Sequence, residues 1–374
     1  MISPVTRFFR LSLALSVFAL SSFHPAQFAR EAQTAVPAAD SVLPGPKPAD
    51  VSIDWKHLVG IYTHGNETVI ILERNRGLFW RVSADPKLLV AQVSEAPIEQ
   101  EPLGSFALMR SGLNDIAISL HKENNENVTA VTVGGKTFIR SDAGSDPAHF
   151  YHVSPAHPVT ELREKALKLS PPAEPGPFRK PDLVELATLD PAVHLDIRYA
   201  SANNFLSTPV YTQARAFLQR PAAEALLRVL HKLQPLGYGL LIHDAYRPWY
   251  GTKIFWDATP PEGKIFVADP KKGSKHNRGC AVDLTLYDLA TGQAVEMPGL
   301  YDEMSPRSFP NFPGGTSLQR WHRDLLRRAM ESEGFAVNED EWWHFDYKDW
   351  KQYGILNVPF EKIAVGEQPA AVSH

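Results

Sequence analysis

Short apolar runs follow one another between residues 51 and 140. They are rich in β-branched and aromatic residues, and Gly, Asn and Asp residues separate them. Such runs predict β-strands, here over 68–72, 77–81, 106–109, 116–120 and 128–133. The Gly-Gly pair within 133–138 predicts a hairpin. We therefore expect residues 51–155 to form a β-rich accessory domain, either a small antiparallel barrel or a sandwich.

The apolar pattern takes on a helical period after Pro221, whose missing N–H costs nothing in a first helical turn. Pro235 and Gly237 end this predicted helix, and residues 238–243 predict a strand directly after it. The expected apolar face of the helix consists of Ala223, Leu226, Leu227, Leu230 and Leu233. This half of the chain therefore mixes helices with strands.

A further strand and helix follow towards the C-terminus. Residues 279–286 predict a strand in which Asp283 points away from the aliphatic neighbours that alternate with it. A helix is expected over 318–333, because Thr316 and Gln319 have the spacing of a capping box and Gly334 follows the last turn. We expect an α+β domain in which helices flank a small antiparallel sheet.

The first residues resemble an export signal. Arg7 and Arg10 precede an apolar run over 11–20, and small residues follow it, which predicts a secretory signal peptide over 1–29. Cleavage after Ser21 and cleavage after Ala29 are both consistent with the pattern. Ten apolar positions are too few to span a bilayer, which needs roughly 20 helical residues. The expected location is periplasmic or secreted, with no stable membrane anchor.

Proline-rich and alanine-rich segments separate the expected domains. Pro residues are dense in 171–177, and their stiffness is typical of a spacer. A chain of 374 residues also has room for two domains. The predicted order is a signal peptide over 1–29, a linker over 30–50, the β-rich domain over 51–155, a linker over 156–182, the second domain over 183–357 and a disordered tail over 358–374.

Charge and cysteine content narrow the function further. The net charge is −4, and both signs are mixed along the chain, so no basic stripe is available for a phosphate backbone and nucleic acid is not an expected partner. The chain has one cysteine, Cys280, which excludes an intrachain disulfide. We expect Cys280 to be a small buried residue rather than a metal ligand.

Four residues in two groups carry the chemistry. His276 and Asp283 belong to the first group, and Glu341 and His344 to the second. A catalytic zinc takes three protein ligands of the His or carboxylate type and keeps one position open for water. His276, Asp283 and His344 fill those three places, and Glu341 remains free to move a proton. Burying these groups without a cation would be costly, so the pattern predicts a hydrolytic site with one zinc ion per chain.

The spacing of these residues resembles a known family. Ser-x-His-x-x-Gly-x-x-x-Asp over 274–283, with Glu-x-x-His over 341–344, is similar to the zinc D-alanyl-D-alanine peptidases of cell-wall metabolism. Further stretches resemble the D-alanyl-D-alanine dipeptidase branch, namely 196–200 with 203–205, Asp-Ala-Tyr-Arg-Pro over 244–248, and the Trp pair 342–343. The resemblance covers 183–353, and the β-rich domain, His243 and Cys280 depart from it.

The resemblance implies roles for individual residues. Zinc is held by the three ligands already named, and Glu341 acts as general base and then general acid. Arg247 matches the arginine that helps to hold the tetrahedral oxyanion. Asp302 matches the aspartate that binds the substrate ammonium group, and Tyr199 shares this task. Ser274 is placed to donate to the C-terminal carboxylate of the substrate.

The expected activity is hydrolysis of the free D-alanyl-D-alanine dipeptide, a small D-amino dipeptide, in peptidoglycan metabolism. Two alternatives stay open at this point. One is a D,D-carboxypeptidase or endopeptidase that acts on peptidoglycan stem peptides. The other is a non-catalytic cell-wall-binding module. The sequence does not determine the oligomeric state.

Overall fold

The computed structural model describes residues 39–83, 95–100, 106–108, 116–123, 127–142, 152–155 and 157–363. The described residues all belong to one compact unit. The signal peptide predicted over 1–29 lies outside the described residues. Within the described ranges, we find no helix with the length and apolar character needed to cross a membrane.

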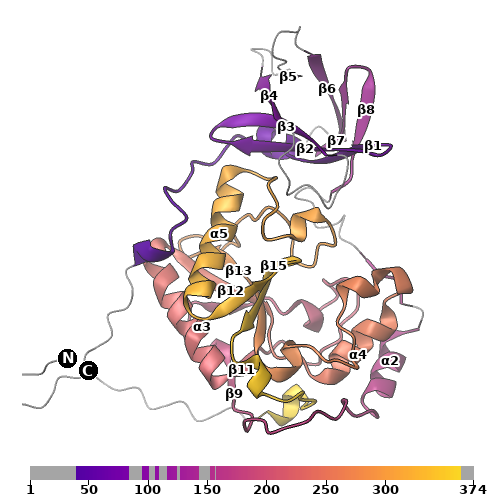
Figure 1. The fold of residues 1–374 in the computed structure, drawn as a ribbon, viewed down its shortest axis with the longest axis vertical. Coiled ribbons are helices and arrows are strands. Elements are labelled where there is room, and N and C mark those ends of the chain that lie inside the picture. Colours follow the sequence, from indigo (N-terminus) through magenta and orange to yellow (C-terminus); the bar gives the residue numbers. More distant parts are fainter. Residues whose placement is uncertain are drawn as a thin grey trace, which may run out of the picture. The chain divides into compact units, whose positions relative to one another are not determined.

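The β-rich segment forms a closed barrel in which each strand is antiparallel to its neighbours and β1 closes the barrel against β8. Figure 1 labels its strands. Side chains such as Tyr62, Val69, Trp80, Val131 and Phe138 fill its core. The strands are β1 Gly60–His64, β2 Glu67–Arg74, β3 Gly77–Ser83, β4 Glu95–Gln100, β5 Phe106–Leu108, β6 Ile116–Glu123, β7 Asn127–Val133 and β8 Lys136–Arg140. The predicted β-rich character is confirmed, with a barrel rather than a sandwich.

The predicted hairpin joins β7 to β8. Gly134 and Gly135 have φ angles of 58° and 80°, and Val133 pairs with Lys136 across the turn. A two-residue hairpin loop with positive φ at both positions follows the twist of its strands, and glycine adopts it without steric cost. Strand β4 was not predicted, because Pro97 and three acidic or amide side chains interrupt its apolar pattern.

The second half of the chain contains a five-stranded sheet in the order β10-β12-β13-β15-β14. Its strands are β10 Val193–Leu195, β12 Tyr238–Asp244, β13 Ala281–Asp288, β14 Phe335–Asn338 and β15 Glu341–Tyr347. The sheet was expected to be antiparallel, but β10 runs parallel to β12. The cause is the long connection between these two strands, which includes a helix and brings the chain back in the same direction.

Helices complete this α+β domain. They are α1 Ile53–Leu58 before the barrel, α2 Val159–Ala166, α3 Arg220–Leu233, α4 Trp249–Ala258 and α5 Ser317–Ser332, and a small sheet pairs β9 Leu183–Glu185 with β11 Phe217–Gln219. Helices α3 and α5 pack against the large sheet and against each other (Figure 1). The predicted capping box is present, because Thr316 and Gln319 exchange side-chain and backbone hydrogen bonds.

The sheet has one apolar face and one polar face. On β13, Val282, Leu284 and Leu286 are fully buried in the main core, to which α3 and α5 also contribute. Cys280 is buried in the same core, as expected. Because side chains alternate along a strand, Asp283 points to the opposite face. The candidate chemistry therefore lies on the face that α3 and α5 leave open.

Three segments that were predicted to be linkers or tail contain packed residues. Helix α2 lies within 156–182 and buries Val159, Leu162 and Ala166. Val42, within 30–50, is 1% exposed, and Phe360, within 358–374, is fully buried. The proline density of these segments conceals a few apolar residues that a neighbouring core accepts. The tail after residue 363 lies outside the described residues.

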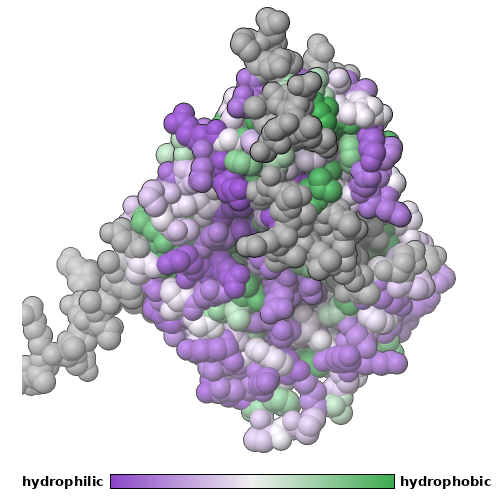
Figure 2. All heavy atoms as spheres, turned by 45° about the horizontal axis from the view of Figure 1, so that its top comes forward, coloured by the Kyte–Doolittle hydropathy of each residue, from purple (hydrophilic) through white to green (hydrophobic). Residues whose placement is uncertain are grey.

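The large apolar side chains that reach the surface are scattered among the described residues. The most exposed are Ile53 and Ile139, at 61% and 62%. On the face drawn in Figure 2, hydrophilic residues dominate and the apolar ones form small spots. Scattered exposure of this kind is ordinary for a globular protein.

Candidate active site

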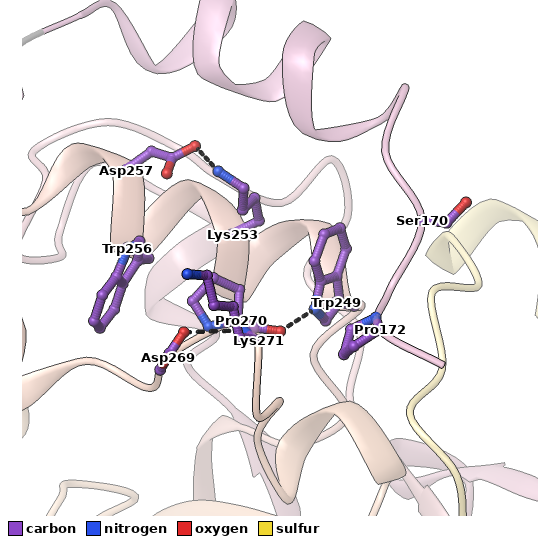
Figure 3. Close-up of a pocket in the computed structure, with 9 residues that line it drawn as sticks. All are labelled: Ser170, Pro172, Trp249, Lys253, Trp256, Asp257, Asp269, Pro270 and Lys271. Atoms are coloured by element: carbon purple, nitrogen blue, oxygen red, sulfur yellow. Dashed lines mark hydrogen bonds and ion pairs between the residues drawn. The ribbon is translucent and has the colours of Figure 1, made fainter. Parts of the chain in front are cut away.

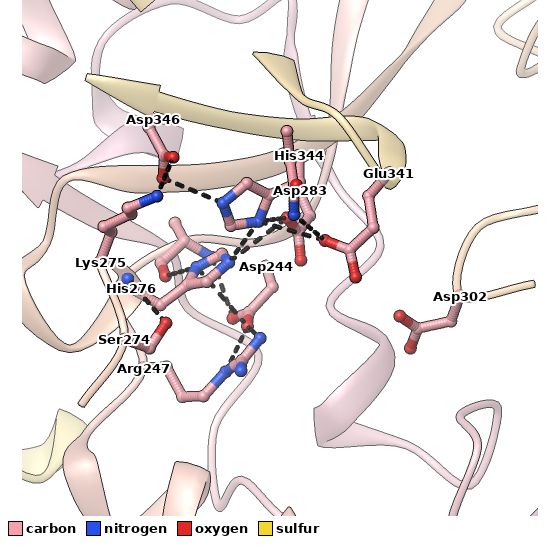
Figure 4. Close-up of polar contacts among 12 residues, drawn as sticks. Asp244, Arg247, Ser274, Lys275, His276, Asp283, Asp302, Glu341, His344 and Asp346 are labelled. Carbon is pink, nitrogen blue, oxygen red and sulfur yellow. Dashed lines mark hydrogen bonds and ion pairs between the residues drawn. The ribbon is translucent and has the colours of Figure 1, made fainter. Parts of the chain in front are cut away.

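Two strands and one turn bring the predicted metal ligands together. Asp283 on β13 lies directly opposite His344 on β15 in the antiparallel register. His276 begins the 3-10 turn His276–Arg278, just before β13. The three residues are buried, and their ligand atoms lie within 4.8 Å of one another. Figure 4 shows the three side chains converging.

The hydrogen bonds of the two imidazoles determine which ring nitrogens carry lone pairs. His276 Nδ1 lies 2.6 Å from the carbonyl oxygen of Ala245, so this nitrogen must donate. His344 Nε2 lies 3.0 Å from Asp346 Oδ1 and donates to that carboxylate. The remaining nitrogens, His276 Nε2 and His344 Nδ1, lie 3.1 Å apart. Two lone pairs therefore point into the same small space.

Asp283 contributes the third ligand atom. Its Oδ1 lies 3.3 Å from His276 Nε2 and 3.0 Å from His344 Nδ1. Neither contact has hydrogen-bond geometry, and among the described residues no donor satisfies this buried oxygen. Burial raises the pKa of Asp283, whereas the interactions with His276 and His344 lower it below its usual range. Each of the three ligand atoms offers an electron pair, and no hydrogen-bond donor in the described part of the chain satisfies Asp283 Oδ1. This arrangement fits a bound cation.

Glu341 begins β15 and lies beside the three ligands. Its Oε2 lies 3.7 Å from His344 Nδ1 and accepts a hydrogen bond of 3.1 Å from Asn338. Burial raises the pKa of Glu341 above its ordinary value. A carboxylate with a raised pKa moves protons more readily near neutral pH, and Glu341 therefore suits the role of general base.

Arg247 follows the end of β12 and is held by Asp244. Its Nε and Nη2 atoms lie 3.0 and 2.8 Å from Asp244 Oδ2. The other oxygen of Asp244 accepts from Ala245 N at 2.9 Å and from Tyr211 at 3.0 Å. The guanidinium group also lies over the Phe255 ring, 4.8 Å from its centre. A buried cation fixed in this way is oriented before any substrate arrives.

Asp302 and Tyr199, predicted to act together, are in direct contact. The Tyr199 hydroxyl donates to Asp302 Oδ2 at 2.7 Å. Figure 4 shows the Asp302 carboxylate pointing from its loop toward the side of the cluster where Glu341 lies. Burial raises the pKa of Asp302 to about 8. Ser274 lies at the other side of the cluster, where its Oγ accepts from His276 N at 3.2 Å.

Four supporting residues were not assigned a role from the sequence. Asp346 binds His344 and also forms an ion pair of 2.5 Å with Lys275. Tyr301 donates to Asp283 Oδ2 at 3.2 Å. Asp244 lies three residues before Arg247, and Tyr301 lies directly before Asp302. This closeness to a predicted site residue is the only signal in the sequence for these two residues. The contact of Lys275 with Asp346, 71 residues away in the sequence, depends on the tertiary structure.

A separate surface pocket of about 340 Å³ lies beside α4 (Figure 3). None of the predicted site residues lines it. Several of its polar groups bind one another: Lys253 pairs with Asp257, and Trp249 Nε1 donates to the carbonyl oxygen of Pro270 at 2.8 Å. The chemistry therefore lies at the His276 cluster rather than in this pocket.

An α+β domain with converging His, Asp and His ligands and an adjacent glutamate defines a candidate metal-dependent hydrolase. Comparison with known proteins agrees with this class. The family described as D-ala-D-ala dipeptidase matches residues 179–365. The chain belongs to this peptidase family, and it is therefore an enzyme.

Curated relatives cover the same part of the chain. The D-alanyl-D-alanine dipeptidase of Escherichia coli (strain K12) is 36% identical over 179 residues, which are 48% of this chain and 91% of the relative. The D-alanyl-D-alanine dipeptidase of Enterococcus faecalis is 35% identical over 178 residues, 42% of this chain and 87% of the relative. That of Streptomyces coelicolor is 33% identical over 175 residues, 42% of this chain and 87% of the relative. The recognised family is the one that the sequence motifs resemble.

Proposed function

We propose that this protein hydrolyses the free D-alanyl-D-alanine dipeptide with one zinc ion per chain. The observation that carries the proposal is the convergence of His276 Nε2, His344 Nδ1 and Asp283 Oδ1 within 4.8 Å, with Glu341 beside them. The names of the curated relatives support the choice of substrate. A binding module without catalysis would have no need of the half-buried Glu341 carboxylate beside the cation site.

His276, Asp283 and His344 would hold the zinc ion, because two imidazoles and one carboxylate form a donor set that zinc accepts in catalytic sites. When bound, zinc lowers the pKa of a coordinated water to roughly 7 and polarises the scissile carbonyl group. The protein's part is to fix its ligands. Ala245 and Asp346 hold the two rings, and Tyr301 holds Asp283.

Glu341 would move the proton. As a carboxylate it accepts a proton from the attacking water, and as a carboxylic acid it returns that proton to the amine that leaves. Its burial favours the protonated form after the first transfer, so the proton is held until the leaving group needs it. The same residue therefore serves both halves of the reaction.

Arg247 would stabilise the negative charge that develops on the carbonyl oxygen. Asp244 and Phe255 hold the guanidinium group in place, so the reaction spends no energy on orienting it. The two ends of the dipeptide need opposite charges. The carboxyl group of Asp302, with Tyr199, would bind the ammonium group, whose positive charge favours the ionised form of this carboxyl group. The Ser274 hydroxyl would donate to the C-terminal carboxylate of the dipeptide.

The length of the substrate tests this function. We expect the purified zinc-loaded protein to release D-alanine from free D-Ala-D-Ala, and to cleave a stem pentapeptide ending in D-Ala-D-Ala far more slowly. The reason is that a longer substrate has no free ammonium group for Asp302 at that position. Amino-acid analysis of both reactions, with L-Ala-L-Ala as the matched control, measures this. Cleavage of the pentapeptide alone would show a carboxypeptidase instead.

A variant of Asp346, which accepts a hydrogen bond from His344, tests how the proposed zinc ligands are held. We expect Asp346→Asn to weaken zinc binding by about 10-fold to 100-fold, because a neutral amide no longer supports the His344 ring as a carboxylate does. Competition with a chromogenic chelator measures the zinc dissociation constant. Activity should return at saturating zinc. Asp340→Asn, at an exposed position before β15, is the control; an equal loss in both variants would contradict the role of Asp346.

A further inference from the structure

The barrel lies outside the region that matches the dipeptidase family, which begins at residue 179. Its own interior is filled by an apolar core. The barrel instead makes contacts with the segment between β13 and α5, and that segment carries Asp302. These contacts fall at Arg307 and between Phe312 and Arg320, all on the C-terminal side of Asp302 in the sequence. They connect the barrel to the segment that carries a proposed active-site residue.

The first contact is a chain of alternating buried charges. The side chain of Asp142, which follows β8, is 1% exposed, and its Oδ1 lies 2.7 Å from Arg140 Nε. Its Oδ2 lies 3.2 Å from Arg307 Nη1. Arg307 Nε in turn donates to the carbonyl oxygen of Pro298 at 2.8 Å and lies 3.4 Å from Glu303 Oε2. Because every charged side chain in this series has a neighbour of opposite charge, the series can stay buried and rigid.

Glu303 extends this chain to the residues beside Asp302. Its Oε2 accepts a hydrogen bond of 2.8 Å from Leu300 N, and its Oε1 accepts one of 2.7 Å from Ser305. Glu303 therefore holds the turn that contains Asp302. The backbone of Asp302 has a φ angle of 57°. A residue with a Cβ atom keeps this left-handed conformation when its surroundings impose it, although Asp tolerates it better than most.

The second contact holds the far end of the segment. Glu73 on β2 is 2% exposed, and its Oε2 accepts a hydrogen bond of 2.6 Å from Ser317 N at the start of α5. Its backbone N donates to Gly315 O at 3.1 Å, and Arg320 donates to its carbonyl oxygen at 2.7 Å. Ile70, Leu72 and Phe312 pack together beside these hydrogen bonds. The segment is thus attached to the barrel at two points.

We propose that the barrel braces the loop that carries Asp302, and that Arg307 and Asp142 are positioning residues for recognition of the substrate ammonium group. This inference rests on the proposed function, because it assigns the ammonium group to Asp302. Arg307 and Asp142 touch neither the zinc ligands nor Glu341. Their effect reaches the reaction through the position of one carboxylate.

Arg307→Met tests the brace. We expect it to raise the KM for free D-Ala-D-Ala about tenfold, with kcat and zinc content unchanged, because a shifted carboxylate weakens substrate binding without affecting the metal site. Arg307→Lys, which keeps the charge, should show a smaller rise. Asp142→Asn, which alters the same ion pair at its barrel residue, should also raise KM. Amide hydrogen exchange should become faster in peptides that span 298–306 and stay unchanged in those that span 276–286.

A double-mutant cycle separates positioning from general destabilisation. If Arg307 acts through Asp302, adding Arg307→Met to Asp302→Asn should raise KM no further. Arg215→Met is the matched control, because it removes another partly buried ion pair, with Glu185, away from this loop. Additive effects, or equal exchange at 298–306 in the Arg307→Met and wild-type proteins, would overturn the brace.

Hydrogen exchange does not depend on turnover, so the two proposals fail in different ways. A wild-type protein that leaves D-Ala-D-Ala intact refutes the proposed function. Faster exchange at 298–306 in Arg307→Met would still establish the mechanical brace in that case. If Arg307→Met does not fold, Arg307→Lys and Asp142→Asn give the same comparison, and unchanged KM and exchange in both would overturn it.

Discussion

Replacing Glu341 by Gln is expected to leave zinc bound and to reduce turnover by about 10²-fold to 10⁴-fold. The side chain keeps its shape and its hydrogen bond with Asn338, and the three proposed zinc ligands are untouched. An amide cannot accept the proton of the attacking water or return one to the leaving amine. The change should therefore appear in kcat far more than in KM.

Steady-state kinetics with D-Ala-D-Ala and a zinc assay on the same preparation measure both quantities. Glu339→Gln is the matched control, because this exposed residue lies two positions before Glu341. Unchanged turnover in the Glu341 variant would show that another group is the base. Loss of zinc from this variant would instead place Glu341 among the ligands.

Removal of one proposed zinc ligand should have an equally large effect with a different signature. We expect His276→Ala to lose stoichiometric zinc and to reduce activity about a thousandfold or more, because several kcal/mol of transition-state stabilisation depend on the metal. A zinc ion that binds the folded state also stabilises it. The wild-type melting temperature should therefore fall when a chelator removes zinc and recover when zinc returns.

The melting temperature of His276→Ala should not respond to the chelator. Its far-UV circular dichroism should match that of the wild type, because the sheet and its apolar face do not depend on the imidazole. His231→Ala provides the control at an exposed histidine in the last turn of α3. A His276→Ala protein with full zinc content would contradict the assigned ligand set.

Periodic patterns in the sequence were sufficient for elements whose apolar residues recur at a fixed spacing. The helix that begins at Arg220, the capping box at Thr316 and the alternation around Asp283 follow from such local spacing. Helix α2 was missed although Val159, Leu162 and Ala166 repeat at helical intervals, because the surrounding prolines favoured a linker. Where an apolar stripe is short, the amino-acid composition and the helical periodicity can predict different structures.

The residues of the candidate site also fall into two groups: those that the sequence predicts and those that only the fold reveals. His276, Asp283, Glu341 and His344 were selected from residue type and spacing alone, and the fold brings all four together. Lys275 gave no comparable signal, because its partner Asp346 lies on β15, 71 residues away in the sequence. The pairing depends on how the turn before β13 packs beside β15, which a linear pattern does not contain.

The sequence by itself therefore determined the α+β class and the family of this protein, and it predicted a ligand set for a metal and a spare glutamate. Only the tertiary structure decided how that chemistry is held. It fixed the lone pairs of the two imidazoles through Ala245 and Asp346, and it joined Asp142 of the barrel to Arg307 beside the Asp302 loop. Residue types set what atoms can do, but distance and orientation arise from contacts between segments far apart in the chain.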